Sequence, residues 1–389
     1  MLHAKVGDKP MKYRKLGTRG PEVPVLGFGC MRLPLLKGDG ERIDEPAATR
    51  LLHAAIERGV TYVDTAYPYH QGESEPWLGR ALQGGYREQV LLATKLPSWA
   101  IETRADCDKY LNEQLVRLKT QRIDCFLLHC LKRAWWEKLK SLGVLEFLDA
   151  AQQDGRIGYA GFSFHDDFAV FEEIVPAYDW AFCQVQYNYM DEDYQAGARG
   201  VRLAAQRGLG VVAMEPLRGG NLAKPLPQEI QDHWPASAQA QNPVERAFRW
   251  LWHQPEVSLV LTSMSLPAQL EENLRLAATA QACGLSADDL AAFNRVRTAI
   301  RSRAKAGCTA CQYCMPCPQG VAIPKILSYY NDRFVFDDRK SASIGYQFLL
   351  APEQQATACN ECGQCEEVCP QHLPIRELLK AGHLELGGS

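Results

Sequence analysis

From about residue 25 to residue 282, short apolar runs alternate with amphipathic stretches, and this alternation constrains the fold more than any other feature. The first run, residues 25–31, predicts a strand, and residues 45–59 place apolar side chains at helical spacing before Gly59 ends the pattern. The further expected strands are residues 61–64, 90–95, 123–129, 157–163, 182–186, 210–214 and 257–262. The further expected helices are residues 75–82, 104–118, 136–153, 166–175, 194–207, 244–252 and 267–280.

The apolar runs show no polar alternation, which is typical of parallel strands buried on both faces. Eight successive strand–helix pairs over roughly 250 residues predict an α/β fold of the (β/α)₈ TIM barrel type. A doubly wound open sheet is the alternative. It is disfavoured because no Gly-x-Gly-x-x-Gly turn follows the first strand, where the sequence reads Leu26-Gly27-Phe28-Gly29-Cys30.

Other segments suggest how the chain is divided. Residues 13–24 have the turn chemistry of a hairpin, and Met11 is a plausible alternative start, so we expect residues 1–10 to be an extension with little structure. Residues 218–242 form a long loop with glycines and prolines, typical of a lid or substrate wall. Residues 286–303 predict one more helix with Ser286 as its N-cap. We therefore expect a barrel over residues 1–304 and a second domain over residues 305–389.

Composition excludes several classes of protein. The chain has 389 residues, of which 46% are hydrophobic, and its formal net charge is −3. This near balance argues against a nucleic-acid partner, which usually requires a basic excess. We find neither an apolar run of about 18 residues, which a membrane span would need, nor a secretion leader. We therefore expect no membrane association and a cytoplasmic location.

Three expected strands end in polar residues with catalytic potential. Asp64, Lys95 and His129 end the runs at 61–64, 90–95 and 123–129, and Tyr69 follows in the loop after Asp64. Because the active sites of such barrels lie where strands end and loops begin, we expect these four side chains to meet at one rim.

The four groups suit a particular chemistry. A Lys ammonium beside a Tyr lowers the pKa of the phenol, and an Asp paired to the Lys holds it in place. The phenol can then act as a general acid, while a neutral His orients a carbonyl oxygen. The set therefore suits proton donation to a carbonyl that receives a hydride on its carbon. Taken singly, a charged residue at a strand end could instead belong to an ordinary structural ion pair.

These residues resemble the motifs of the aldo-keto reductase superfamily, in the right order over about residues 12–300. The matching segments are Asp64-Thr65-Ala66-Tyr67-Pro68-Tyr69, Ala93-Thr94-Lys95, Leu127-Leu128-His129, Gly161-Phe162-Ser163, Gln184-Val185-Gln186-Tyr187-Asn188, Pro216-Leu217-Arg218-Gly219-Gly220 and Gln269-Leu270-Glu271-Glu272-Asn273. The resemblance implies NADPH or NADH as the cofactor and a small carbonyl compound as the substrate.

The resemblance also implies roles for individual residues. Tyr69 would be the proton donor, Lys95 and Asp64 would tune it, and His129 would orient the carbonyl. Ser163 and Gln184 would hold the nicotinamide carboxamide. The other implied cofactor-binding residues are Met214, Pro216, Leu217, Arg218, Ser263, Ser265, Gln269, Glu272 and Asn273.

Three positions depart from the family pattern. Met214 stands where many members stack an aromatic ring on the nicotinamide, and Phe164 stands where an Asn often follows the Ser163 position. Thr262 and Gln269 stand where members that prefer NADPH carry a Lys and an Arg for the 2′-phosphate. Since a phosphate is usually bound by cations, the sequence leaves the choice of nicotinamide open.

Fourteen cysteines are unevenly spread along the chain. Six lie before residue 300 and are expected to be small buried apolar residues. The other eight form two runs, Cys308, Cys311, Cys314 and Cys317, then Cys359, Cys362, Cys365 and Cys369, and each run ends in Cys-Pro. Cys-x₂-Cys pairs can also make zinc sites, which is the alternative.

The runs are similar to those of bacterial two-cluster ferredoxins, in which the fourth cysteine of each run binds the other cluster. That analogy assigns Cys308, Cys311, Cys314 and Cys369 to one [4Fe–4S] cluster, and Cys359, Cys362, Cys365 and Cys317 to a second. We expect a mostly helical ferredoxin-like domain, because residues 323–330 read as a helix. A subset of aldo-keto reductases carries such a tail.

The sequence therefore predicts a nicotinamide-dependent carbonyl reductase fused to an iron–sulfur module. The module would either exchange electrons with a redox partner protein or substrate, or stabilise the chain. The alternative is a non-catalytic redox-sensing or binding subunit on the same scaffold. Trp99, Trp135 and Trp136 could form a wall for an apolar or sugar-like substrate, or could be buried scaffold residues.

Overall fold

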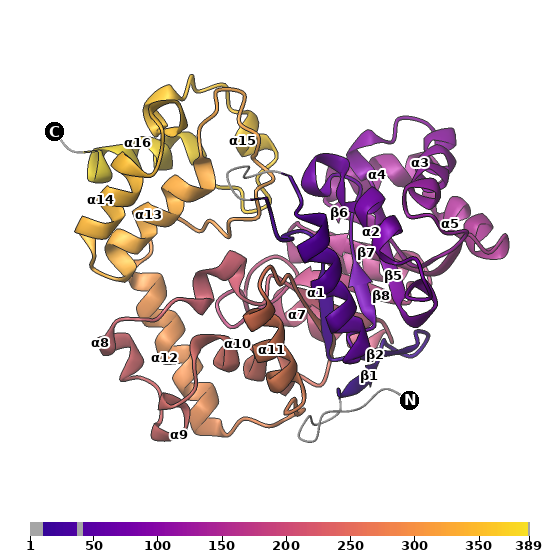
Figure 1. The fold of residues 1–389 in the computed structure, drawn as a ribbon, viewed down its shortest axis with the longest axis horizontal. Helices are drawn as coiled ribbons and strands as arrows, with labels where there is room; N and C mark the ends of the chain where they lie inside the picture. Colours follow the sequence, from indigo (N-terminus) through magenta and orange to yellow (C-terminus); the bar gives the residue numbers. More distant parts are fainter. Residues whose placement is uncertain (1–10, 37–41, 388–389) are drawn as a thin grey trace. The chain divides into compact units, whose positions relative to one another are not determined.

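The computed structural model describes residues 11–36 and 42–387 (Figure 1). The expected extension at residues 1–10 lies outside the described residues. By its internal contacts the chain divides into two compact units. Unit 1 runs from the N-terminus to Pro216 and resumes at Phe248–Gly284, and unit 2 comprises Leu217–Ala247 and Leu285–Ser389. Contacts alone define these units, so the domain boundary expected at residue 304 stays a prediction.

Unit 1 is built around a closed barrel of eight parallel strands, in the order β10-β3-β4-β5-β6-β7-β8-β9. The strands are β3 (Leu26–Gly29), β4 (Tyr62–Asp64), β5 (Leu91–Leu96), β6 (Ile123–Leu131), β7 (Ile157–Phe164), β8 (Phe182–Gln186), β9 (Gly210–Met214) and β10 (Val257–Thr262). This confirms the predicted (β/α)₈ barrel. The doubly wound open sheet is wrong, because β10 pairs with β3 and leaves no free edge.

Helices lie around these strands (Figure 1). They are α1 (Glu45–Glu57), α2 (Ser74–Ala81), α3 (Arg104–Arg117), α4 (Arg133–Ser141), α5 (Val144–Gln153), α6 (Phe168–Ile174), α7 (Gly197–Gln206), α10 (Pro243–His253) and α11 (Pro267–Ala277). The single helix expected at residues 136–153 is two helices, α4 and α5. Gly143 between them takes a left-handed φ of 71°, which breaks the helical path.

The expected hairpin is present as β1 (Tyr13–Lys15) paired antiparallel with β2 (Glu22–Pro24). The guanidinium of Arg14 ties it to the barrel by donating to the carbonyls of Trp252 at 2.5 Å and Val257 at 2.6 Å.

Of the six scattered cysteines, Cys283 is exposed and the other five are buried. Cys283 departs from the expectation because it lies in the turn that follows α11, outside the core.

In unit 2, the segment expected as a long loop carries short helical pieces: η5 (Arg218–Ala223), α8 (Gln228–Gln231) and α9 (Ala236–Gln239). Helix α12 (Ala287–Arg303) begins as predicted, with the Ser286 hydroxyl accepting from the backbone N–H of Asp289. No helix in the described part of the chain combines the length and apolar character needed to cross a membrane.

The cysteine-rich part of unit 2 is mostly helical, as predicted. It comprises α13 (Ile323–Val335), α14 (Arg339–Phe348), η6 (Pro352–Gln354), η7 (Ala356–Ala358), α15 (Gln364–Glu367) and α16 (Ile375–Leu386). Val321, Ile326, Leu327, Tyr346 and Leu386 are fully buried in its small core. Six of the eight clustered cysteines pack against that core: Cys308, Cys314, Cys317, Cys359, Cys365 and Cys369.

Candidate functional site

The ends of two neighbouring strands form a buried ion pair. Asp64 ends β4 and Lys95 lies near the end of β5, and each residue is at most 1% exposed. The Lys95 ammonium donates to Asp64 Oδ1 at 2.7 Å and to the backbone carbonyl of Thr65 at 2.6 Å. The parallel pairing of β4 with β5 brings the two side chains to the same end of the barrel.

Tyr69 and His129 lie beside this ion pair. Tyr69 begins η1 (Tyr69–Gly72), the short turn that follows β4, and its ring centroid is 5.1 Å from Lys95 Nζ. His129 comes from β6, and its ring centroid is 6.1 Å from that of Tyr69, with the planes at 80°. The structure therefore brings together the four residues for which the sequence predicts carbonyl chemistry.

Burial controls the protonation of these groups. It raises the pKa of Tyr69 well above its usual value, the Asp64 carboxylate raises it further, and Arg32 partly opposes both. We expected Lys95 to lower this pKa instead. Burial and the Asp64 carboxylate have the larger effects on this pKa, and both raise it. Tyr69 therefore keeps its proton at neutral pH and remains able to donate it.

His129 is held in its neutral form. Burial lowers its pKa well below the usual range, and the nearby Lys95 and His165 lower it further. His165, just after β7, is also buried, and its pKa falls to about 4. A neutral imidazole can donate an N–H hydrogen bond to a carbonyl oxygen without carrying charge into the site.

A buried carboxylate lies behind Lys95 and was not among the predicted site residues. Glu75 on α2 is fully buried, and its Oε1 accepts from Thr94 Oγ1 at 2.7 Å and from Gln114 Nε2 at 2.6 Å. Gln114 also donates to the Lys95 carbonyl at 3.0 Å. This network fixes the end of β5. The signal in the sequence was a Glu in line with Leu78 and Leu82 at helical spacing, on a face that is otherwise apolar.

Two tryptophans extend from His129. The ring centroid of Trp99 is 5.1 Å from that of His129, and Trp135 is 5.9 Å from Trp99. Both are half-buried, and Lys132 Nζ lies 4.3 Å from the Trp135 ring. Trp136, in contrast, is fully buried and belongs to the scaffold. Trp99 and Trp135 can therefore form one wall beside His129.

The residues implied for the nicotinamide lie on the next strands. The Ser163 hydroxyl on β7 accepts from the backbone N–H of Cys130 at 2.6 Å. The Gln184 amide on β8 donates to Met214 Sδ at 3.7 Å. Gln184 Oε1 is buried and has no hydrogen-bond partner within the described ranges. A buried amide oxygen without a partner can accept a hydrogen bond from a ligand that carries an N–H donor, such as a carboxamide.

The residues implied for the adenosine end lie after β10. Gln269 Oε1 accepts from the backbone N–H groups of Ser265 and Leu266 at 2.9 and 3.2 Å, so it caps the start of α11. Asn273 on the same helix is 4% exposed, and Glu272 is half-buried. A Cβ added at Gly29 would come within 3.2 Å of Ser263 Oγ, so the first barrel strand passes close to this segment.

The implied cofactor loop is divided between the two units. Met214 and Pro216 belong to unit 1, whereas Leu217 and Arg218 begin the segment that belongs to unit 2. Within unit 2, Arg218 Nη2 donates to the carbonyl of Gly307 at 3.2 Å, next to Cys308.

The eight clustered cysteines line two cavities of unit 2. A small cavity of about 20 Å³ is lined by Cys308, Cys311, Cys314 and Cys369, among other residues. A second cavity of about 160 Å³ is lined by Cys317, Cys359, Cys362 and Cys365, with Cys314 shared between the two. Burial raises the pKa of Cys314 to about 12. The assignment of these cysteines to two clusters stays a prediction.

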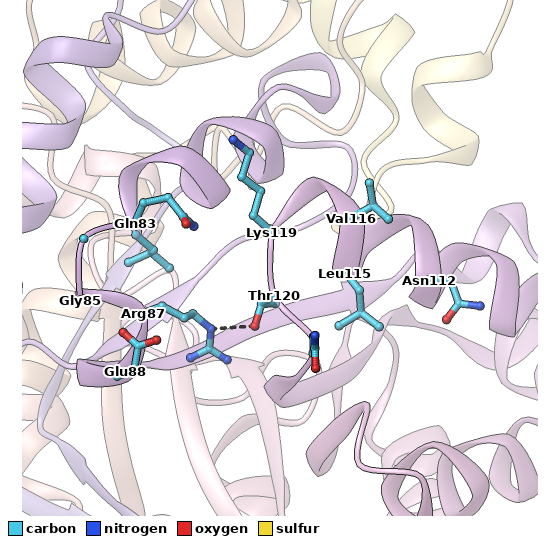
Figure 2. Close-up of a pocket in the computed structure, with 12 residues that line it drawn as sticks. Gln83, Gly85, Arg87, Glu88, Asn112, Leu115, Val116, Lys119 and Thr120 are labelled. Atoms are coloured by element: carbon cyan, nitrogen blue, oxygen red, sulfur yellow. Dashed lines mark hydrogen bonds between the residues drawn. The ribbon is translucent and has the colours of Figure 1, made fainter.

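Unit 1 also has a wide, open hollow between the end of α2 and the end of α3 (Figure 2). Its volume is about 810 Å³, and none of the predicted site residues lines it. Arg87 in this hollow donates to Thr120 Oγ1 at 3.2 Å and to the carbonyl of Arg122 at 2.7 Å, and it pairs with Asp124 at 2.8 Å. The Arg87 cation is thus engaged by the protein itself.

Comparisons with known proteins show two family matches along the chain. The sequence model of the aldo/keto reductase family matches residues 25–297, and that of a 4Fe-4S dicluster domain matches residues 307–373. An oxidoreductase named YqkF from Bacillus subtilis (strain 168) is 28% identical over 296 residues, which cover 69% of this chain and 91% of the relative.

Two further similarities are informative. The 6-dehydroglucose reductase of Novosphingobium aromaticivorans is 29% identical over 288 residues, which cover 68% of this chain and 89% of that protein. The solved structure of aldo-keto reductase AKR11C1 from Bacillus halodurans, in its holo form, is similar with a TM-score of 0.62 and 26% identity. That similarity covers 74% of this chain and 96% of that one.

Proposed function

The chain belongs to the aldo/keto reductase family and carries a 4Fe-4S dicluster domain at its C-terminal end, and from this premise we propose that it reduces a carbonyl substrate with NADPH or NADH. The enzyme is then an oxidoreductase whose active site is the rim formed by Asp64, Tyr69, Lys95 and His129. The contact that carries the proposal is the buried Lys95–Asp64 pair beneath the Tyr69 ring, with His129 alongside.

Each residue has a task in this reaction. Tyr69 donates the proton to the carbonyl oxygen, because burial keeps its phenol protonated. Neutral His129 donates a hydrogen bond that orients the same oxygen. Lys95, held in place by Asp64, stabilises negative charge that develops on the phenol as the proton leaves.

The cofactor site is proposed along β7 to β10. The buried Gln184 Oε1 would accept from the carboxamide, and Ser163 and Met214 would line the same face. Ser263, Ser265, Gln269, Glu272 and Asn273 would lie toward the adenosine end. The bound nicotinamide supplies the hydride that the carbonyl carbon receives.

The decisive experiment replaces the proton donor. Tyr69→Phe removes only the hydroxyl, and we expect kcat to fall by a factor on the order of 10² or more, as for loss of a general acid. Nicotinamide binding, measured by fluorescence titration, should be retained. Full activity in this variant would remove Tyr69 from the mechanism. If the wild-type chain bound neither nicotinamide, the non-catalytic redox-sensing subunit would be favoured instead.

The substrate class can be narrowed by experiment. Half-buried Trp99 and Trp135 offer ring faces beside His129, which suits stacking against a sugar ring or an apolar group. One similar protein acts on an oxidised glucose, as its name states. We therefore propose sugar-derived carbonyl compounds as the first class to test, with simple apolar aldehydes as the comparison.

We also propose that the module holds two [4Fe–4S] clusters, with the fourth cysteine of each run exchanged between them. The support is the 4Fe-4S dicluster model that matches residues 307–373, together with the two runs of four cysteines in that segment. Cys369→Ser should therefore abolish the same spectroscopic signal as Cys308→Ser, and Cys317→Ser the same signal as Cys362→Ser. Metal analysis and electron paramagnetic resonance of the anaerobically purified variants give the answer. Pairing within each run, or zinc in place of iron, would contradict this assignment.

The role of the clusters is either electron exchange or stabilisation. Exchange with a redox partner protein or with substrate is supported by the exposure of Cys362 beside the second cavity. Stabilisation is supported by the six cysteines packed against the unit 2 core. Cluster absorbance followed during turnover separates the two, because only electron exchange requires it to bleach and recover at the rate of catalysis.

A further inference from the structure

A buried threonine hydroxyl lies at the cavity lined by Cys308, Cys311, Cys314 and Cys369. Thr309 is 1% exposed and lines this cavity together with the four cysteines. Its Oγ1 is buried and has no hydrogen-bond partner within residues 11–36 and 42–387. Buried hydroxyls are nearly always hydrogen-bonded, so this one indicates an acceptor supplied by whatever fills the cavity.

An iron–sulfur cluster supplies acceptors of this kind. Its sulfides and its cysteine sulfurs carry negative charge and accept hydrogen bonds, which are one of the protein's means of setting the reduction potential. The backbone of the same loop already contributes one such bond, since the N–H of Ala310 donates to Cys308 Sγ at 3.4 Å. Ile323, Leu327 and Leu373 in the lining offer no acceptor in their side chains. Gln312 and Gln371 also line the cavity, but Thr309 Oγ1 makes no hydrogen bond to either amide.

We propose that the Thr309 hydroxyl donates a hydrogen bond to a sulfur of the cluster held by Cys308, Cys311, Cys314 and Cys369, and thereby raises its reduction potential. The reduced cluster carries one more negative charge than the oxidised cluster. It therefore accepts a stronger hydrogen bond, so the hydroxyl stabilises the reduced state more. The inference rests on the proposed clusters and is independent of carbonyl reduction.

The second cysteine run has a different residue at the matching position. Asn360 follows Cys359 as Thr309 follows Cys308, but Asn360 is exposed, and its Oδ1 accepts from the backbone N–H of Cys362 at 3.3 Å. Asn360 therefore provides the matched control for Thr309, in the same local sequence context and at the other cavity.

The test is a redox titration of the full-length, anaerobically purified, iron-loaded protein, followed by electron paramagnetic resonance. Thr309→Val keeps the shape of the side chain and removes the donor. We expect the equilibrium constant for reduction of one cluster to fall roughly three- to tenfold, a shift of about 28 to 59 mV to more negative potential for a one-electron couple. Thr309→Ser keeps a donor and should stay near the wild-type potential. Asn360→Ala should leave the reduction potential of the cluster beside Thr309 unchanged.

Several outcomes would overturn the inference. They are an unchanged potential in Thr309→Val, an equal shift in Thr309→Ser, or equal shifts of both clusters. If Thr309→Val does not retain iron, retention by Thr309→Ser assigns the requirement to the hydroxyl, and loss of iron in both variants overturns the inference. Carbonyl reductase activity is measured separately, so failure of the proposed catalytic function is recognised independently of these potentials.

Discussion

At the scale of residues, burial decides the charge states of the proposed active site. Lys95 and Asp64 compensate each other at 2.7 Å, and burial raises the pKa of Tyr69 and lowers that of His129. The site thus consists of an internally neutralised ion pair and two neutral hydrogen-bond donors. Such a site receives a neutral carbonyl without the cost of desolvating an uncompensated charge.

The neighbouring imidazole of His165 gives a stability prediction. Its folded pKa of about 4 lies below the usual 6.5. As the pH falls below about 6.5, His165 is protonated in the unfolded chain but stays neutral in the folded chain. The free energy of unfolding therefore decreases from about pH 6.5 down to about pH 4. In His165→Gln this loss should be smaller by about 2 kcal/mol between pH 7 and pH 5. Urea unfolding of both proteins at the two pH values measures it, and equal losses would contradict the prediction.

At the scale of elements, the segment between β9 and β10 differs most from expectation. It was expected as a loop, and it carries short helical pieces that belong to unit 2. Within that unit it is tied to the region of the cysteines by Arg218 on the Gly307 carbonyl and by Lys224 on Asp332 at 2.8 Å. Proline and glycine content indicated irregular backbone, but it could not indicate the partner of that backbone.

Two adjacent glycines in this segment give a matched prediction. Both have positive φ, but a Cβ at Gly219 would lie 2.0 Å from the carbonyl oxygen of Thr309, whereas a Cβ at Gly220 meets nothing within 4 Å. Gly220→Ala should therefore cost only backbone strain, about 1–2 kcal/mol. Gly219→Ala should cost clearly more and should loosen residues 307–311. Thermal unfolding and limited proteolysis compare the two, and equal effects would show that the backbone approach at Gly219 is not tight.

At the scale of the whole molecule, the two compact units are stabilised in different ways. Unit 1 closes its sheet into a barrel, and most residues of the barrel strands are buried. Unit 2 has, around the cysteines, a small core of few apolar residues, and most of those cysteines pack against it. Small cores are marginal without a metal or a cross-link, so we expect cluster binding at the cysteines to contribute to the folding of unit 2.

Removing iron should therefore affect the two units unequally. In the iron-free full-length chain, we expect amides of α13, α14 and α16 to lose protection in hydrogen exchange, while those of β5, β6 and β7 keep it. Reconstitution with iron and sulfide should restore protection in the helices. Equal protection of these helices with and without iron would mean that the apolar core suffices to hold unit 2 together.

The sequence by itself determined the features that depend on the order and spacing of residues along the chain. Strand–helix alternation determined the barrel. Since parallel strands end on one side, it also determined that Asp64, Lys95 and His129 meet. Spacing alone likewise indicated the two runs of cysteines. Only the tertiary structure decided the rest. It showed that the pKa of Tyr69 is raised, and it revealed the Glu75 network behind Lys95. It also decided the unit to which residues 217–247 belong and left the buried Thr309 hydroxyl without a hydrogen-bond partner among the described residues. Each of these depends on which segments distant in sequence pack together, and a local pattern carries no information about that.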